Sequence, residues 1–405
     1  MKPTTALSTA DYIALEARHN AHNYHPLDIV VERAEGPWMW DVEGRKYLDF
    51  LAAYSAVNQG HCHPRIVEAA RDQLGKVTLT SRAFRNDQLP HLVKELCELS
   101  GFDMCLPMNS GAEAIETLIK AARKWAYEVK GVLNNQAEIV VCKDNFHGRT
   151  TTAISMSTEP DYRKNFGPFT PGFLSIPYGD LQALEDAINP NTAAFLVEPI
   201  QGEAGVNIPP PGYLAEAAAL CKKHKVLLAV DEIQTGLGRT GKLFAFQHEN
   251  VTPDLVAIGK ALSGGILPVS AVLATRDILG RFKPGDHGST FGGAPFAARV
   301  AREALKVLVE ERLVEKSAEL GEYFKGLLQT IHNPLIHEVR GRGLFIGLEL
   351  KPQAGGARQY CEALMKEGLL CKETHHHTIR FAPPLVITKE ELDWAFERIK
   401  KVLSA

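Results

Sequence analysis

Short apolar segments alternate with stretches of helical periodicity from residue 46 to about residue 295. The apolar segments are too short for typical helices and lack a polar face, which is typical of strands buried on both faces of a sheet. Strands that alternate with helices predict an α/β domain with a mostly parallel sheet. The sequence places these strands at 138–142, 193–197, 226–230, 255–258 and 270–274.

The pattern changes after residue 295. A long helical stretch runs through Val309, a second helical stretch covers 317–331, and an apolar run covers 344–350. A last helix begins at the capping box of Thr388 and Glu391. These features predict a second, smaller α+β domain. The predicted division is an N-terminal arm and hairpin segment (1–52), a large domain (53–295) and a small C-terminal domain (296–405).

Composition excludes several classes of protein. The 405 residues include 45 Lys and Arg against 48 Asp and Glu. The chain therefore lacks the excess of basic residues that would suggest nucleic-acid binding. No apolar run approaches the roughly 20 residues needed to cross a bilayer. Residues 1–11 lack the features of a signal or transit peptide. Seven cysteines without a C-x-x-C pair favour reduced thiols, and we therefore expect a cytoplasmic protein.

The clearest helix is expected at 112–127, where apolar residues form one stripe. Ser110, Gly111 and Ala112 stand at its start, where unpaired backbone N–H groups and the helix dipole attract an anion such as phosphate. Ser110 and Glu113 also have the spacing of a capping box. A structural cap and a phosphate site can coexist at this position.

Asp231 and Lys260 each follow a predicted buried strand, at the edge where open α/β sheets place their ligands. A lysine at such a position must be neutralised, paired or used covalently, because an isolated buried ammonium is costly. Taken alone, Lys260 could extend its amine to solvent and Asp231 could stabilise a turn. Together with the phosphate signal, they point to pyridoxal phosphate chemistry: the lysine binds the aldehyde, the aspartate faces the pyridine nitrogen, and the helix start holds the phosphate.

Several longer motifs occur in a fixed order along the chain. They are AYSAVNQGHCHP from Ala53, LPMNSGAEA, NFHGRT, VEPIQGEAG, DEIQTGLGRTG, GKALSGG, HGSTFGGAP and RFAPPL. With these motifs, the chain resembles the pyridoxal-phosphate aminotransferases of the ornithine, acetylornithine and GABA group, over about residues 23–385. The resemblance implies the pyridoxal-phosphate-dependent transferase fold, which is like that of aspartate aminotransferase.

The resemblance also implies cofactor contacts. Lys260 matches the residue that bonds to the cofactor aldehyde, and Asp231 matches the partner of the ring nitrogen. Gln234 matches a contact to the phenolic oxygen, and Phe146 matches the aromatic residue that stacks on the ring. The stacking role of the following His147 stays open, since some members have tryptophan there. Thr290 is similar to a residue that reaches the phosphate of the neighbouring subunit, which implies a homodimer with shared sites.

The substrate residues are likewise implied by the resemblance. Arg380 matches the group that pairs with the carboxylate next to the keto carbon of 2-oxoglutarate, a role that suits its planar fork. Glu203 matches a switch that pairs with Arg380 until the keto acid displaces it. Arg149 would hold the distal carboxylate, and Tyr24 and Tyr54 would line the pocket. Because Tyr24 matches a contact to the α-carboxylate of ornithine, we expect transfer of the δ-amino group of ornithine to 2-oxoglutarate.

Other functions stay open at this stage. An aminotransferase for N-acetylornithine or GABA would have the same fold and cofactor, an aminomutase or racemase would need no keto acid, and a binding protein could retain the fold. The segment from Gly236 to Gly241 matches a dinucleotide fingerprint, but its glycines do not directly follow a strand. His375, His376 and His377 are expected in an exposed loop, and we expect no metal site.

Overall fold

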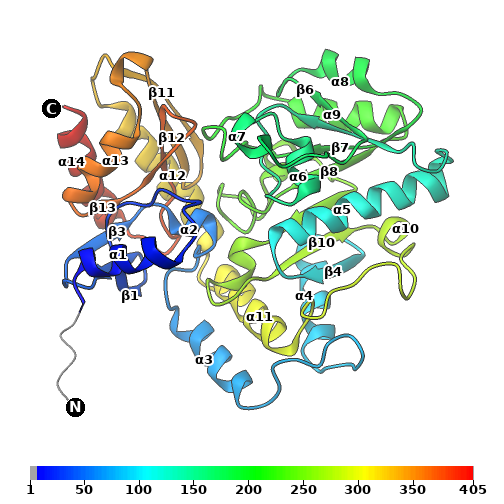
Figure 1. The fold of residues 1–405 in the computed structure, drawn as a ribbon, viewed down its shortest axis with the longest axis horizontal. Helices are drawn as coiled ribbons and strands as arrows, with labels where there is room; N and C mark the ends of the chain where they lie inside the picture. Colours follow the sequence, from blue (N-terminus) through cyan, green and yellow to red (C-terminus); the bar gives the residue numbers. More distant parts are fainter. Residues whose placement is uncertain (1–6, 405) are drawn as a thin grey trace.

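The computed structural model describes residues 7–404, so the first six residues of the predicted arm lie outside the described residues. The larger part of the molecule is built on a seven-stranded sheet (Figure 1). Strand β10 runs antiparallel to β4 and β9, and the other neighbouring pairs are parallel. In spatial order the strands are β4 (Met104–Met108), β10 (Ser270–Ala274), β9 (Leu255–Ile258), β8 (Leu227–Asp231), β7 (Thr192–Val197), β5 (Glu138–Cys142) and β6 (Phe173–Ile176).

The five strands predicted from apolar runs are confirmed, three of them with the same bounds. The sequence pattern did not identify β4 and β6, which are the two edge strands and are only partly buried. Edge strands need fewer apolar positions, and β4 even contains Pro107, which a sheet accepts at its edge because no ladder hydrogen bond is lost there.

Helices cover both faces of this sheet. The predicted helix at 112–127 is α5 (Gly111–Trp125), which packs on β9 and β10 and continues as the π-helical turn η1 (Ala126–Lys130). The other helices of this part of the molecule are α3 (Pro64–Leu74), α4 (Leu89–Ser100), α6 (Thr151–Met156), α7 (Pro160–Arg163), α8 (Leu181–Ala187), α9 (Tyr213–Lys223), η2 (Ala245–Glu249), η3 (Lys260–Ser263), α10 (Arg276–Leu279) and α11 (Pro295–Glu310).

The smaller part contains two four-stranded sheets. One has the order β11 (Ile336–Arg342), β12 (Phe345–Leu350), β15 (Thr378–Phe381), β14 (Lys372–Thr374), and the other has the order β1 (Val31–Glu35), β2 (Trp38–Asp41), β3 (Lys46–Asp49), β13 (Leu369–Leu370). The surrounding helices are α1 (Thr9–His19), α2 (Ala52–Ser55), α12 (Leu313–Gln329), η4 (Pro352–Ala354), α13 (Arg358–Lys366) and α14 (Lys389–Leu403). The predicted capping box of α14 is present.

The two ends of the chain meet in the second of these sheets. Strand β3 pairs in parallel with β13, and Figure 1 shows the blue N-terminal strands beside the orange and red C-terminal helices. The indole of Trp38 on β2 also donates a hydrogen bond to Glu391 on α14, at 2.7 Å. The predicted N-terminal segment is therefore packed against the C-terminal domain, while α11 packs against α3 and α4 of the larger part. Within residues 7–404, no helix has the length and apolar character of a membrane span.

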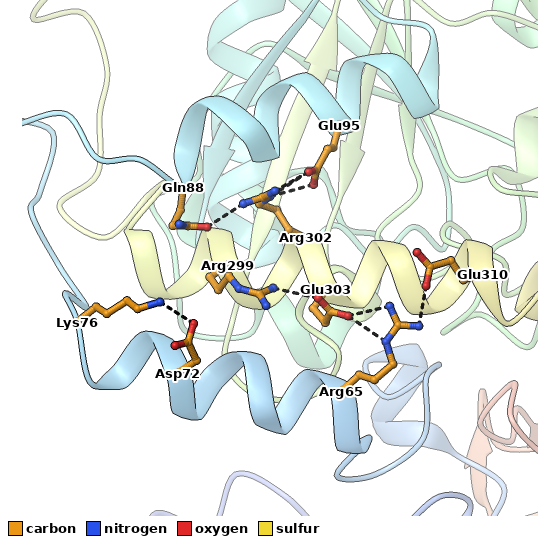
Figure 2. Close-up of polar contacts among 9 residues, drawn as sticks. All are labelled: Arg65, Asp72, Lys76, Gln88, Glu95, Arg299, Arg302, Glu303 and Glu310. Atoms are coloured by element: carbon orange, nitrogen blue, oxygen red, sulfur yellow. Dashed lines mark hydrogen bonds and ion pairs between the residues drawn. The ribbon is translucent and has the colours of Figure 1, made fainter.

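Ion pairs tie α3 and α4 to α11 (Figure 2). Glu303 on α11 accepts hydrogen bonds from Arg65 on α3, at 2.8 Å, and from Arg299, at 3.0 Å. Arg302 on the same helix contacts Glu95 on α4 at 2.9 Å. Burial alone would raise the pKa of Glu303, but the hydrogen bonds from the two arginines lower it below its usual value. Glu303 is therefore an ionised, buried junction between two helices.

Replacing Glu303 with alanine is expected to lower the free energy of unfolding by roughly 2 kcal/mol, because hydrogen bonds to a buried charge are lost. Since the folded pKa is depressed, this contribution is present at neutral pH and disappears as the pH falls through that pKa. Urea titrations at pH 7 and pH 4 would measure both effects. Glu310, which pairs with Arg65 on the exposed side, is the control, and its replacement is expected to cost under about 1 kcal/mol.

Candidate active site

A cavity of about 210 Å³ opens at the carboxyl ends of the central parallel strands. Asp231 is the last residue of β8, and Lys260 follows β9 after a single glycine. Both residues line the cavity, so the sheet brings together the two groups that the sequence singled out. The remaining lining residues are Gly111, Ala112, Phe146, His147, Gly148, Glu198, Ile200, Ile233, Gln234 and Thr235.

Lys260 begins the short helix η3 with a positive φ of 42°. A non-glycine residue in this region carries strain, and such strain often accompanies functional positions. Burial lowers the pKa of Lys260 below its usual value, although the carboxylates of Glu203 and Asp231 oppose this shift. Burial thus favours the neutral form of the amine, the nucleophile that attacks an aldehyde.

Asp231 is held by groups on two sides. Its Oδ1 accepts a hydrogen bond from the backbone N–H of Ile233 at 3.0 Å, and its Oδ2 lies 2.8 Å from Nδ1 of His147. Burial alone would lower the pKa of His147, but the hydrogen bond with Asp231 and its charge raise it. The contact with Asp231 therefore favours the protonated form of His147. The sequence drew attention to this position only as a possible stacking residue, because contacts between distant segments leave no periodic signal.

The expected phosphate end of the cavity lies at the start of α5. Ser110 and Glu113 form the predicted capping box, while Gly111 and Ala112 line the cavity. A Cβ added to Gly111 would lie 3.1 Å from the side chain of Ile233, and one added to Gly148 would lie 3.2 Å from Ala112. The two glycines thus keep free the space beside the helix start, and the helix dipole favours an anion there.

Glu203 and Arg380 form an ion pair with 2.6 Å between Oε1 and Nη1. Gln234 joins them, because its Nε2 donates to Glu203 at 2.9 Å and its Oε1 accepts from Arg380 at 3.1 Å. The Arg380 side chain is only 1% exposed. Burial alone would raise the pKa of Glu203, but the charges of Arg380 and Lys260 lower it to about 2. The Glu203 carboxylate therefore stays ionised over the whole physiological pH range.

The other predicted substrate residues lie further out. The Arg380 guanidinium carbon is 4.9 Å from the ring centre of Tyr54, and the exposed Arg149 stacks on Tyr162 at 3.6 Å. Tyr24 is 77% exposed, and Thr290 is exposed as well. None of these four residues lines the cavity within the described single chain, and neither do Glu203 and Arg380, which contact its lining residue Gln234. Their proposed roles stay predictions.

Glu198 is a buried acid of the cavity that sequence reasoning missed. Its Oε2 accepts a hydrogen bond from the backbone N–H of Phe146 at 3.1 Å. Burial raises the pKa of Glu198 to about 8, so its carboxyl is mostly protonated at neutral pH. The only available signal was its place directly after strand β7, at the same sheet edge as Asp231.

The stability contributed by protonated Glu198 is expected to be lost as the pH rises toward 8, because the folded pKa lies above the unfolded one. Glu198→Gln removes this dependence. The difference in the free energy of unfolding, variant minus unsubstituted protein, is therefore expected to be a few kcal/mol larger at pH 9 than at pH 5. Denaturant titrations at both pH values measure the change, with exposed Glu68→Gln as control. A difference that does not vary with pH would contradict the assignment.

Comparisons with known proteins agree with this geometry. The family model for class-III aminotransferases matches residues 19–403. The ornithine aminotransferase of Halalkalibacterium halodurans is 61% identical over 396 residues, which cover 98% of this chain and 99% of that protein. A Toxoplasma gondii ornithine aminotransferase structure, with partial occupancy of pyridoxal phosphate at its active site, has a TM-score of 0.97, 47% identity, and coverage of 98% of this chain and 94% of that one. The acetylornithine aminotransferase of Elizabethkingia anophelis has a TM-score of 0.89, 50% identity, and coverage of 98% and 99%.

The residues of the cavity fit pyridoxal phosphate, the cofactor of this family. A buried amine, a buried carboxylate and a helix start with open space beside it line the same cavity. These are the groups that the aldehyde, the ring nitrogen and the phosphate of the cofactor require. The predicted fold class is also confirmed by the mixed, mostly parallel sheet and by the similar structures. The chain therefore belongs to the class-III aminotransferases, which are pyridoxal-phosphate-dependent enzymes.

Proposed function

We propose that this enzyme transfers the δ-amino group of L-ornithine to 2-oxoglutarate. The products are glutamate and glutamate 5-semialdehyde, which cyclises to pyrroline-5-carboxylate. The high identity to an ornithine aminotransferase supports this substrate pair. The observation that carries the proposal is the 2.6 Å contact between Glu203 and Arg380 beside the cavity of Lys260.

This ion pair can accommodate the different charges that the two substrates carry near their reacting atoms. Ornithine presents a cationic amine without a nearby carboxylate, whereas 2-oxoglutarate presents its keto carbon next to a carboxylate. A free Arg380 would repel the amine, so Glu203 neutralises it during the ornithine half-reaction. The keto acid then offers Arg380 a bidentate carboxylate partner, and Glu203 gives way. One pocket can thus accept both substrates.

Bound pyridoxal phosphate supplies an aldehyde that takes up the amino group and a ring that withdraws electrons from the reacting carbon. The Lys260 amine, which lines the cavity, would act as the base and then the acid that moves the proton of the substrate carbon. Asp231, held by His147, would face the ring nitrogen of the cofactor. The N–H groups at the start of α5 would hold the phosphate.

The outer residues complete the proposed pocket. Tyr24 would contact the α-carboxylate end of ornithine, Tyr54 would line the pocket, and Arg149 would hold the distal carboxylate of 2-oxoglutarate. Thr290 would reach the phosphate of a second copy of the chain, so we propose a homodimer with shared sites. The exposure of Thr290 and Tyr24 in the single chain is compatible with such roles. We also propose a cytoplasmic enzyme, because all seven cysteines are free thiols.

The test is a product assay with ornithine, alone and with 2-oxoglutarate. With both substrates, pyrroline-5-carboxylate and glutamate are expected in equal amounts. With ornithine alone, turnover is expected to stop after one equivalent per site, a result that an aminomutase or racemase would not give. Continued turnover without a keto acid would contradict the proposal.

A second candidate is an acetylornithine aminotransferase, favoured by the 50% identity to the Elizabethkingia anophelis enzyme. Values of kcat/KM for ornithine, N-acetylornithine and GABA separate the candidates. The proposal predicts the highest value for ornithine, and Tyr24→Phe is expected to lower that value more than the value for GABA, which has no α-amino acid end. A higher value for N-acetylornithine would favour the second candidate.

A further inference from the structure

Glu203 lies in a tight loop of residues 201–207, here named the gate loop. Backbone hydrogen bonds between Gln201 and Asn207, at 3.0 and 2.9 Å, close its base. Gly205 and Val206 have positive φ values of 118° and 57°, so the loop has a specific, strained backbone. The position of the Glu203 carboxylate therefore depends on what holds this backbone in place.

The gate loop lies against one row of residues across the sheet of β11, β12 and β15. In this sheet Gly347 on β12 pairs with Arg340 on β11 on one side and with Arg380 on β15 on the other. Residues directly opposite each other point to the same face, so both arginines flank Gly347 on one face. A Cβ added to Gly347 would lie 3.1 Å from the carbonyl oxygen of Gly205 and from Cβ of Val206. The missing side chain makes room for the gate loop between the two arginines.

The two arginines contact different parts of the gate loop. Arg380 binds the side chain of Glu203, whereas Arg340 binds the backbone. The Nη2 of Arg340 donates to the carbonyl of Gly205 at 2.6 Å, and its Nε donates to the carbonyl of Val206 at 3.1 Å. The planar fork of arginine suits two successive carbonyl groups, which a single ammonium could not reach in the same way.

Arg340 is also fixed on its other side. Its Nη1 contacts Glu338 at 3.1 Å and makes a further ion pair with Glu349, and its side chain is only 12% exposed. It does not line the cavity, where the described chain places Lys260 and Asp231. Its charge is therefore already balanced, and its contact with the active site runs through the gate loop.

We propose that Arg340 is a positioning residue that sets the specificity of the enzyme, because it holds the gate loop where Glu203 meets Arg380. This inference rests on the proposed function of that ion pair. If the backbone is released, Glu203 neutralises Arg380 less well. The ornithine half-reaction then slows, while anionic dicarboxylates gain access to Arg380. A residue with a purely structural role would lower both half-reactions together.

The experiment compares the holoenzyme with Arg340→Met, Glu203→Ala and the double variant, by single-turnover rates with ornithine and with glutamate. Arg340→Met is expected to lower the ratio of the ornithine rate to the glutamate rate roughly tenfold, because hydrogen bonds from a charged donor are lost. The inhibition constant of glutarate, an unreactive dicarboxylate, is expected to fall. In the Glu203→Ala background, the same substitution is expected to change the ratio by less than about twofold, since coupled residues are not additive.

Two further variants provide an independent second test and a matched control. Gly347→Ala pushes on the gate loop from the same row and is expected to shift the ratio in the same direction, so the inference can be tested even if Arg340→Met does not fold. Arg398→Met is the matched control. Arg398 on α14 also donates to two backbone carbonyls, of Glu367 and Trp394, but outside the gate loop. It is expected to leave the ratio unchanged.

An equal loss in both half-reactions, or an undiminished effect of Arg340→Met without Glu203, would overturn the inference. If Glu203→Ala itself leaves the ratio unchanged, the proposed gating function fails instead. A normal effect of Glu203→Ala together with inert Arg340→Met and Gly347→Ala variants would refute only the role of Arg340. The two failures are therefore distinguishable.

Discussion

Lys260→Ala is expected to reduce amino-group transfer by at least ~10⁴-fold, because one amine serves both as the anchor of the cofactor and as the acid and base of the proton transfer. Lys260 is buried and lines the same cavity as Asp231. No second lysine is among the described residues that line this cavity. Steady-state rates with ornithine and 2-oxoglutarate measure the loss.

A chemical measurement separates this role from a general loss of structure. Borohydride treatment of the unsubstituted enzyme is expected to attach the cofactor mass to the peptide that contains Lys260. The Lys260→Ala variant is expected to remain unlabelled while its circular dichroism spectrum is unchanged. Labelling of another lysine in the unsubstituted enzyme would contradict the assignment.

Arg380→Met is expected to slow the half-reaction with 2-oxoglutarate by roughly 10²-fold or more, because a buried, hydrogen-bonded charge pair with the substrate is lost. The half-reaction with ornithine is expected to fall less, since its reacting end has no carboxylate. Stopped-flow absorbance of the cofactor under single-turnover conditions measures each half-reaction. Equal losses in both would contradict a role of Arg380 in recognition of the keto acid.

Features that depend on residues close together in the chain could be predicted from the sequence. Buried parallel strands are continuous apolar runs, so 138–142, 255–258 and 270–274 were predicted with their observed bounds. The capping box of Ser110 and Glu113 is likewise a contact within one turn. The placement of Asp231 and Lys260 at one sheet edge followed from the general geometry of parallel sheets.

Contacts between distant segments could not be predicted in this way. The pairing of β3 with β13 joins residues about 320 positions apart, and nothing in the local pattern of either strand specifies it. The hydrogen bond from His147 to Asp231 and the fork of Arg340 on the gate loop are similar cases. The resemblance to known aminotransferases suggested the partners Glu203 and Arg380, but only the structure shows their contact at 2.6 Å.

The most direct test of the central claim, that the Glu203–Arg380 pair lets one pocket serve two unlike substrates, is the single-turnover rate of each half-reaction in Glu203→Ala. The ornithine half-reaction is expected to slow at least roughly tenfold, because Arg380 is then left unpaired in front of an incoming cation. The glutamate half-reaction is expected to keep its rate or to become faster. Unchanged rates in both half-reactions would contradict the account.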